Sequence, residues 1–365
     1  MKILIFTWRD IKNPKAGGSE VYFHELAKRW IKLGNRVQWI SAGWKNCKKQ
    51  ESIDGVKINR VGGEMSLYLL APFIYLSLKE KPEIIIDNEN GIPFFTPLFS
   101  LKRKFLHIHH NHKEIWKTQT ESRGLKDKLL GKIGYFLENI LMPRIYRNIS
   151  VITISPSSKE EISKGYKKIA GVVNPGIEFY KYKKISKSKN PSILFLNRIK
   201  RYKGVKTLLD ASVKLRDIKN LEVLIAGEGD DLEEMKEYAR KKEIKNVKFL
   251  GRISEEKKQE LMQKTWVFIN PSSKEGWGIV NIEANYFGTP VIGSNVSGIK
   301  DSVIHEKTGL LFEHGNDKDL AEKIRVLLHN KKLREKMGKT GKEWALKFDW
   351  DKKAKEYLKI LKETG

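Results

Sequence analysis

Two series of alternating apolar strands and helices constrain the fold of this chain most strongly. The first series begins with a buried strand at Lys2–Trp8, and the second begins with a strand at Ser192–Ile199. Between them, Tyr180–Ser192 is polar and rich in lysine, as linkers are. Strands that alternate with helices form parallel sheets covered by helices on both faces. The sequence therefore predicts an α/β protein with two doubly wound, Rossmann-like domains, over residues 1–180 and 190–349.

Length and composition agree with a folded protein of two domains. The 365 residues are 40% hydrophobic and 32% charged, which is typical of globular chains. Cys47 is the one cysteine, so an internal disulfide is excluded and a reducing compartment is favoured. The first strand starts almost at Met1, and the apolar run Met65–Leu78 is shorter than the ~20 residues that span a bilayer. We expect a cytoplasmic protein in which this run packs inside a domain.

The chain is strongly basic, with 71 Lys and Arg, 44 Asp and Glu and a net charge of +27. Such charge could neutralise nucleic-acid phosphates, and a nucleic-acid-binding protein is one alternative. The basic residues are dispersed, however, and no recognition module is present. We therefore expect no nucleic-acid partner.

Residues 270–288 combine a strand end, a glycine loop and the start of a helix. Gly276 and Gly278 let the backbone approach a ligand, and the N-terminus of the following helix attracts an anion such as phosphate. Glu275 and Glu283 could accept hydrogen bonds from sugar hydroxyls in the same pocket. This pattern indicates a nucleotide-sugar site. The alternative is an ordinary turn followed by a solvent-exposed glutamate.

A second candidate site lies between the strand that ends near Ile199 and a helix from Val205. Arg198, Lys200, Arg201 and Lys203 could supply the positive charge that a diphosphate needs. In a chain this basic, the alternative is a solvated loop.

In the first domain, Gly17 and Gly18 precede a helix from Ser19 to about Leu33. Ser19 is expected to cap this helix, and the glycines could present N–H groups to a phosphate or a sugar. The alternative is a tight turn between strand and helix.

Four histidines follow the strand near residue 105, namely His107, His109, His110 and His112. No cysteine and no clear carboxylate accompanies them, so we predict no metal site here. A structural role for these histidines is the other interpretation.

Residues 124–148 form a helix candidate interrupted near Pro143, within a segment, 101–150, of local charge +7 (11 basic and 4 acidic residues). Its apolar stripe predicts that the helix covers the sheet. Its basic face, which includes Lys126, Lys128 and Lys132, could also contact anionic lipid headgroups.

The segment EGWGIVNIEANYFGTPVIGS, which starts at Glu275, resembles the E-x7-E signature of retaining glycosyltransferases of sequence family 4, which have the GT-B fold. The continuation SGIKDSVIHEKTGLLF is also similar to that family. The resemblance implies that Glu275 contacts the donor sugar and Glu283 the ribose. It also implies that the loop and helix start between them line the donor site, through Gly276, Trp277, Gly278 and Ile279.

The resemblance extends over nearly the whole chain and implies further roles. It assigns the diphosphate to Arg198 and Lys203, although Asn197 stands where the family usually has glycine. It places Gly17 and Gly18 opposite the donor phosphates and acceptor, and His109 in the active site, with His110 and His112 as open alternatives. It implies that the base is flanked by Gly227, Gly229 and Arg252.

The implied reaction is hexosyl transfer from a UDP- or GDP-sugar to an acceptor hydroxyl, with retained configuration and without a metal or other cofactor. His109 would position groups, and the departing phosphate could deprotonate the acceptor. The resemblance also implies that the helix over 350–365 crosses back to the first domain. It favours cell-envelope glycan or lipid-linked acceptors, reached from the inner face of the plasma membrane. The alternatives within the fold are a sugar-nucleotide epimerase and a glycogen-synthase-like transferase.

Overall fold

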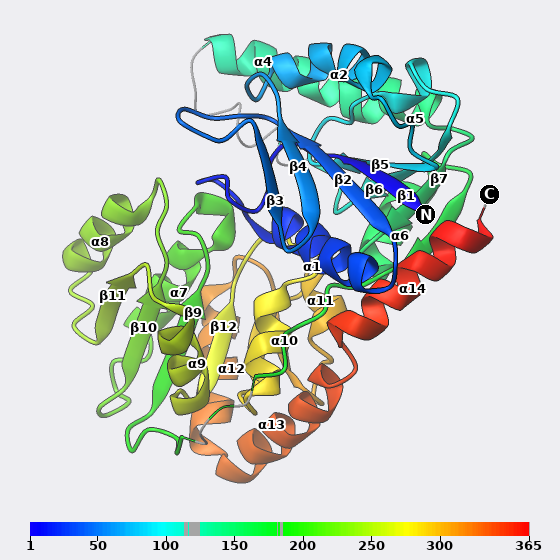
Figure 1. The fold of residues 1–365 in the computed structure, drawn as a ribbon. Coiled ribbons are helices and arrows are strands. Elements are labelled where there is room, and N and C mark those ends of the chain that lie inside the picture. Colours follow the sequence, from blue (N-terminus) through cyan, green and yellow to red (C-terminus); the bar gives the residue numbers. More distant parts are fainter. Residues whose placement is uncertain (113–115, 117–124, 181, 183–184, 365) are drawn as a thin grey trace. The chain divides into compact units, whose positions relative to one another are not determined.

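The chain divides into two compact units in a computed structural model (Figure 1). The structure describes residues 1–112, 116, 125–180, 182 and 185–364, without the side chains of 125–127 and 130. Unit 1 comprises Met1–Gly176 and Trp350–Gly365, and unit 2 comprises Ile177–Asp349. Both units are α/β, each built on one largely parallel sheet.

Unit 1 contains an eight-stranded sheet with the order β3-β4-β2-β1-β5-β6-β7-β8. Neighbouring strands are parallel except β3 and β4, which form an antiparallel hairpin that the sequence did not predict. Its turn holds Asp54 and Gly55 with φ values of 49° and 82°, and this Asp-Gly pair favours such a turn. The strands are β1 Lys2–Phe6, β2 Arg36–Ser41, β3 Gln50–Ile53, β4 Val56–Arg60, β5 Ile84–Glu89, β6 Arg103–Ile108, β7 Ser150–Thr153 and β8 Ile169–Val172.

Helices pack on this sheet, and the C-terminal helix packs on the first of them. Trp30 Nε1 donates to the carbonyl of Ala354 at 3.0 Å, and Arg29 pairs with Asp351, so α14 is anchored to α1 within unit 1. The helical segments are α1 Gly18–Lys32, α2 Ser66–Ser77, η1 Thr96–Leu98, α4 Leu125–Phe136, the π-helical η2 Leu137–Leu141, α5 Met142–Ile145, α6 Pro156–Ser163 and α14 Trp350–Glu363.

Unit 2 is a parallel sheet with the order β11-β10-β9-β12-β13-β14. Alternate residues of β9 face two hydrophobic clusters, because Ile193 and Phe195 belong to one and Leu194 to the other. The strands are β9 Ser192–Leu196, β10 Glu222–Ala226, β11 Val247–Gly251, β12 Val267–Asn270, β13 Val291–Ser294 and β14 Gly309–Phe312. The helices are η3 Arg201–Lys203, α7 Val205–Val213, α8 Leu232–Lys241, α9 Glu255–Lys264, α10 Ile279–Tyr286, α11 Ile299–Ser302, α12 Asp317–His329 and α13 Lys331–Ala345.

The prediction that Met65–Leu78 packs inside a domain is wrong for one face of α2. Leu67, Ala71 and Tyr75, spaced four residues apart, are buried. The opposite face is open, and Leu69 and Phe73 are 77% and 69% exposed. A helix packs only one of its faces against the sheet. A helix that is apolar all round therefore leaves the side chains of its other face outside the core.

The helix predicted over 124–148 is likewise not a simple cover for the sheet. The π-helical η2 interrupts it just before Pro143, which lacks the N–H that an α-helix needs. Large apolar side chains of α4 and η2 are exposed, namely Leu129, Ile133, Phe136 and Ile140. Among the described residues, no helix has both the length and the apolar content needed to cross a membrane.

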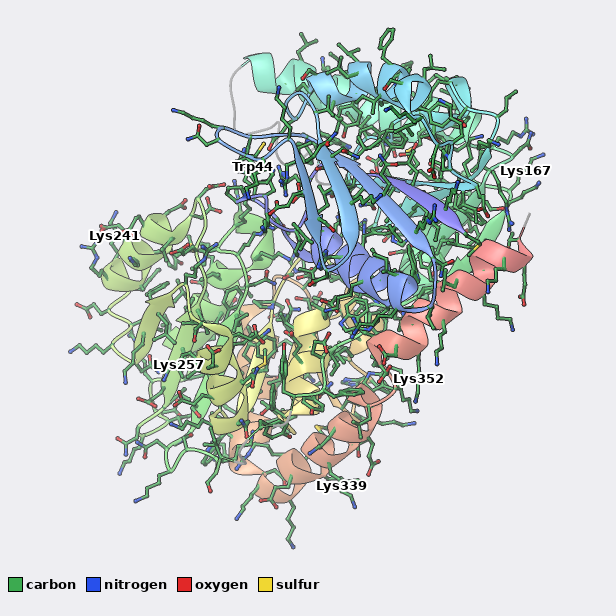
Figure 2. All side chains as sticks on the ribbon, in the orientation of Figure 1. Trp44, Lys167, Lys241, Lys257, Lys339 and Lys352 are labelled. Atoms are coloured by element: carbon green, nitrogen blue, oxygen red, sulfur yellow. The ribbon has the colours of Figure 1, made fainter. Side chains whose placement is uncertain are left out.

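The lysine-rich stretch is bound to unit 2 over part of its length. Ser188 N–H donates to the carbonyl of Lys264, and Lys187 Nζ donates to the carbonyl of Thr265 at 2.8 Å. Burial lowers the pKa of Lys187 to about 7. Other lysines project outward, including Lys241, Lys257 and Lys339 of unit 2 (Figure 2). The net charge is therefore spread over the surface.

Candidate active site

Glu275 is the centre of a hydrogen-bonded cluster in unit 2. Its Oε1 accepts from Lys203 Nζ at 2.6 Å, from Ser272 Oγ at 3.0 Å and from Asn197 Nδ2 at 3.2 Å. The side chain of Lys203 is 8% exposed and that of Glu275 is 15% exposed, so this ion pair is largely withdrawn from water. Two predicted site residues are thus in direct contact, and the amide of Asn197 takes part where the family usually has glycine.

The local backbone explains why Lys203 reaches Glu275. Lys203 ends the short helix η3, and Gly204 follows with φ of 73°. A Cβ on Gly204 would lie 2.2 Å from the carbonyl oxygen of Pro271, so only glycine allows this approach. The loop after β9 is therefore pressed against the loop after β12, which carries Glu275.

The glycine loop before α10 has the predicted helix start. Gly278 caps α10 in the left-handed region, with φ of 77°, and Ile279 begins the helix. This N-terminus leaves N–H groups that favour an anion. Gly276 and Trp277 are buried, and the Trp277 ring packs on Phe348 with centroids 5.1 Å apart.

Glu283 lies in α10 and has a different cationic partner from Glu275. Its Oε1 accepts from Lys258 Nζ of α9 at 2.9 Å, and Lys258 also pairs with Glu255. The two predicted carboxylates are therefore each paired with a lysine of their own. Sequence reasoning missed Lys258 because it is one of many lysines on a solvent-facing helix.

Arg198, Gly227, Gly229 and Arg252 lie on loops that join the same edge of the sheet. Arg198 and Arg252 are exposed, with Arg252 Nε 3.7 Å from Glu228 Oε2. A Cβ on Gly227 would lie 1.9 Å from the carbonyl oxygen of Asn197, and one on Gly229 would lie 2.1 Å from that of Ile199. Glycine is needed at both positions for packing, because it lets the two loops meet at the edge of the sheet where Glu275 lies.

In unit 1, Gly17 rather than Ser19 caps α1, so the predicted cap is wrong. Gly17 N–H donates to the Glu20 carboxylate at 2.7 Å, and Gly18 begins the helix. The Ser19 hydroxyl lies 2.8 Å from His109 Nε2 and accepts from Asn88 Nδ2 at 3.2 Å. A tertiary partner has replaced the local capping bond.

His109 is a buried imidazole held by two polar groups. Its Nε2 lies 2.8 Å from Ser19 Oγ and 3.0 Å from Asn88 Oδ1, at the carboxyl ends of β5 and β6. Burial, with a smaller effect of His112, lowers the pKa of His109 to about 3. A neutral ring suits a positioning role. Ser19 and Asn88 are functional candidates that the sequence pattern did not single out.

The depressed pKa of His109 predicts a loss of stability in acid. The folded protein keeps this ring neutral, whereas the unfolded chain takes up a proton below about pH 6.5. The contribution of His109 to the free energy of unfolding is therefore complete above that pH and decreases as the pH falls toward 3. At pH 5 the free energy of unfolding is lower by about 2 kcal/mol for this reason. We expect His109→Gln to show a smaller decrease in melting temperature between pH 7.5 and 5 than the parent. The exposed His329→Gln serves as the control, and equal pH dependence in all three proteins would contradict the assignment.

The premise that no carboxylate accompanies the histidines is wrong in the folded chain. His112 Nδ1 lies 3.6 Å from an oxygen of Glu89 and 3.6 Å from one of Glu138. Burial raises the pKa of Glu89 to about 8. These carboxylates come from β5 and η2, 23 residues before and 26 after His112, so spacing could not reveal them.

Comparison with known families identifies the class of protein. The family described as "Glycosyltransferase Family 4" matches residues 16–179, and the one described as "Glycosyl transferases group 1" matches residues 177–344. Together they cover residues 16–344, which include the candidate site residues of both units and all the named strands except β1. The chain belongs to the glycosyltransferases with the GT-B fold. Both matches are to transferases, which disfavours the nucleic-acid-binding alternative.

Individual relatives extend over all or half of the chain. An uncharacterized glycosyltransferase of Methanocaldococcus jannaschii is 26% identical over 99% of this chain and 98% of that protein. An N,N'-diacetylbacillosaminyl-diphospho-undecaprenol alpha-1,3-N-acetylgalactosaminyltransferase of Campylobacter jejuni is 32% identical over 49% of this chain and 46% of that protein. The solved structure of Anabaena HepE in complex with UDP and glucose has a TM-score of 0.74, with 17% identity over 99% of both chains, and supports the fold.

Proposed function

We propose that this chain is a retaining hexosyltransferase that uses a UDP- or GDP-sugar and needs no metal for the diphosphate. The observation that carries the proposal is the contact of Lys203 with Glu275 beside the N-terminus of α10. A fixed cation next to helix N–H groups can stabilise the charge that develops on a leaving diphosphate. The UDP complex of HepE, a protein of the same fold, supports UDP as the donor nucleotide.

Within this proposal each residue has a separate task. Glu275 accepts from sugar hydroxyls and holds Lys203 toward the diphosphate, while the exposed Arg198 adds a second charge. Glu283 accepts from the ribose. On unit 1, His109 with Ser19 orients the acceptor hydroxyl, which loses its proton to the departing phosphate.

The test is a screen of UDP- and GDP-sugars by thermal shift, followed by NMR of the product. We expect one donor class to raise the melting temperature and the product to keep the donor's anomeric configuration. Turnover should be the same with and without added Mg²⁺. An inverted product would overturn the retaining mechanism, and a free epimerised sugar nucleotide would show an epimerase.

We also propose that the acceptor is a lipid-linked or cell-envelope molecule, reached by docking on the inner face of the plasma membrane. The C. jejuni relative is named for a diphospho-undecaprenol acceptor. Unit 1 presents exposed apolar side chains, which are Met65 just before α2, Leu69, Phe73 and Leu76 on α2, and Leu129, Ile133 and Phe136 on α4. Both helices lie along the upper edge of unit 1 in Figure 1.

Charge complementarity selects an anionic bilayer as the partner of these side chains. Lys128 and Lys132 are exposed on α4 among the apolar residues, whereas the side chain of Lys126 lies outside the described residues. Apolar side chains enter the interface, and each basic residue near anionic headgroups contributes about 1 kcal/mol.

Co-sedimentation with vesicles tests the docking. Binding should increase with anionic lipid and decrease with salt, and both Lys128→Glu/Lys132→Glu and Leu69→Ser/Phe73→Ser should reduce it. The charge-matched control is the double variant Lys339→Glu/Lys352→Glu, which changes two exposed lysines that lie outside α2 and α4. Equal binding of the parent to neutral and anionic vesicles would contradict the proposal.

A further inference from the structure

Three metal-ligating side chains outside the donor site meet in the interior of unit 1. Glu89 ends β5, His112 follows β6, and Glu138 lies in the π-helical η2. One ligand atom from each lies within 4.8 Å of the others, and this is the one such group among the described residues. Because π-helical turns inside α-helices occur often at functional sites, the placement of Glu138 is notable.

The two separations from His112 match those around a small divalent ion. His112 Nδ1 lies 3.6 Å from Glu89 Oε1 and 3.6 Å from Glu138 Oε1. Tetrahedral zinc, with bonds of about 2.0–2.2 Å, holds its ligand atoms about 3.3–3.6 Å apart. An ion between the three groups would therefore keep both His112 separations and require at most a shift of one carboxylate toward the other, since all three atoms lie within 4.8 Å.

Among the described residues, the cluster also lacks a fixed positive charge from the protein. Glu89 is fully buried and Glu138 is 4% exposed, and the charged groups that act on Glu89 are His112, Glu138 and Asp87. Across the described part of the chain, no lysine or arginine forms an ion pair with Glu89 or Glu138. Glu89 Oε2 is buried without a hydrogen-bond partner there. Buried carboxylates are stable when protonated, paired or bound to a metal, and here three potential ligand atoms lie close enough for a metal.

Surrounding donors hold the ligands in place, as they do in metal sites. Trp116 Nε1 donates to Glu138 Oε2 at 2.6 Å, His112 N–H donates to Glu138 Oε1 at 2.7 Å, and Gly91 N–H donates to Glu89. The Trp116 ring fits against Gly134, where a Cβ would lie 2.9 Å from it.

We propose that Glu89, His112 and Glu138 form a binding site for a divalent transition-metal ion, with Zn²⁺ as the best fit. One imidazole and two carboxylates supply three ligands, which leaves a fourth position for water or a substrate oxygen. The site belongs to unit 1, whereas Lys203 and Glu275 belong to unit 2. It is therefore compatible with a donor diphosphate that needs no Mg²⁺.

Calorimetric titration of chelator-stripped full-length protein with Zn²⁺ tests the site. We expect one equivalent to bind and to raise the melting temperature. Glu138→Gln and His112→Gln should each weaken binding by more than 10-fold, and Trp116→Phe, which removes only the donor to Glu138, should weaken it about 10-fold. His24→Gln is the matched control, because His24 faces one carboxylate, that of Asp54 at 2.8 Å.

Circular dichroism of the metal-free variants separates lost affinity from lost folding. The proposal is overturned if the stripped parent takes up no stoichiometric Zn²⁺, or if folded Glu138→Gln and His112→Gln bind it as the parent does. This readout does not use sugar transfer, so its failure would leave the proposed reaction untouched.

Discussion

We expect Lys203→Met to lower kcat/KM by about 30- to 1,000-fold, which corresponds to a loss of about 2–4 kcal/mol of transition-state stabilisation. Lys203 is buried at the end of η3, two residues before α7 begins, and its ammonium is held 2.6 Å from Glu275. A positioned charge of this kind stabilises the leaving diphosphate more strongly than a mobile surface lysine, because water screens it less. Steady-state kinetics with the donor found in the screen measure the effect.

Two further variants separate catalysis from stability. Lys206→Met changes an exposed lysine of α7, three residues further along the chain and paired with Asp210, and should leave kcat/KM within twofold of the parent. Lys203→Met alone leaves Glu275 without its cation and should lower the melting temperature, whereas Lys203→Met/Glu275→Gln should recover much of it and stay inactive. Turnover of Lys203→Met within twofold of the parent would refute the role of Lys203.

The second large effect concerns the two glutamates, which should differ in kind. Glu275→Gln should lower kcat by about 10- to 100-fold, because hydrogen bonds to a charged group contribute about 1.5–3 kcal/mol. Gln keeps an oxygen for Ser272 and Asn197 but loses the charge that holds Lys203. Glu283→Gln should instead weaken nucleotide binding about 10-fold and change kcat little.

Calorimetry with the free nucleoside diphosphate and steady-state kinetics distinguish the two outcomes. Glu256→Gln removes an exposed carboxylate on α9 and should behave as the parent in both measurements. If both Glu275→Gln and Glu283→Gln also match the parent, the assignment of these residues to the donor pocket is wrong.

Local sequence determined the two α/β sheets and the glycine loop before α10, because both depend on patterns a few residues long. The apolar runs at Lys2–Phe6 and Ser192–Leu196 became central strands, and Gly278 precedes α10 as its position predicted. The antiparallel β3 escaped prediction because Gln50–Ile53 is polar and lies at an edge, where no apolar pattern is required.

Tertiary structure alone decided which polar groups meet. Ser19 looked like a helix cap, but His109 and Asn88, far along the chain, bind its hydroxyl. His112 looked unaccompanied until the parallel order of β5 and β6 and the turn of η2 brought Glu89 and Glu138 to it. The physical reason is that strands adjacent in a parallel sheet bring their carboxyl ends together whatever their separation in sequence.

The same limit applies to the surface of unit 1. The sequence showed that the run Met65–Leu78 is apolar, and it could not show that Leu69 and Phe73 lie outside the core. Burial depends on which face of a helix meets the sheet, and a helix that is apolar all round gives no amphipathic signal to choose one. In the folded chain, Leu67, Ala71 and Tyr75 are the residues that pack against the neighbouring β-strands.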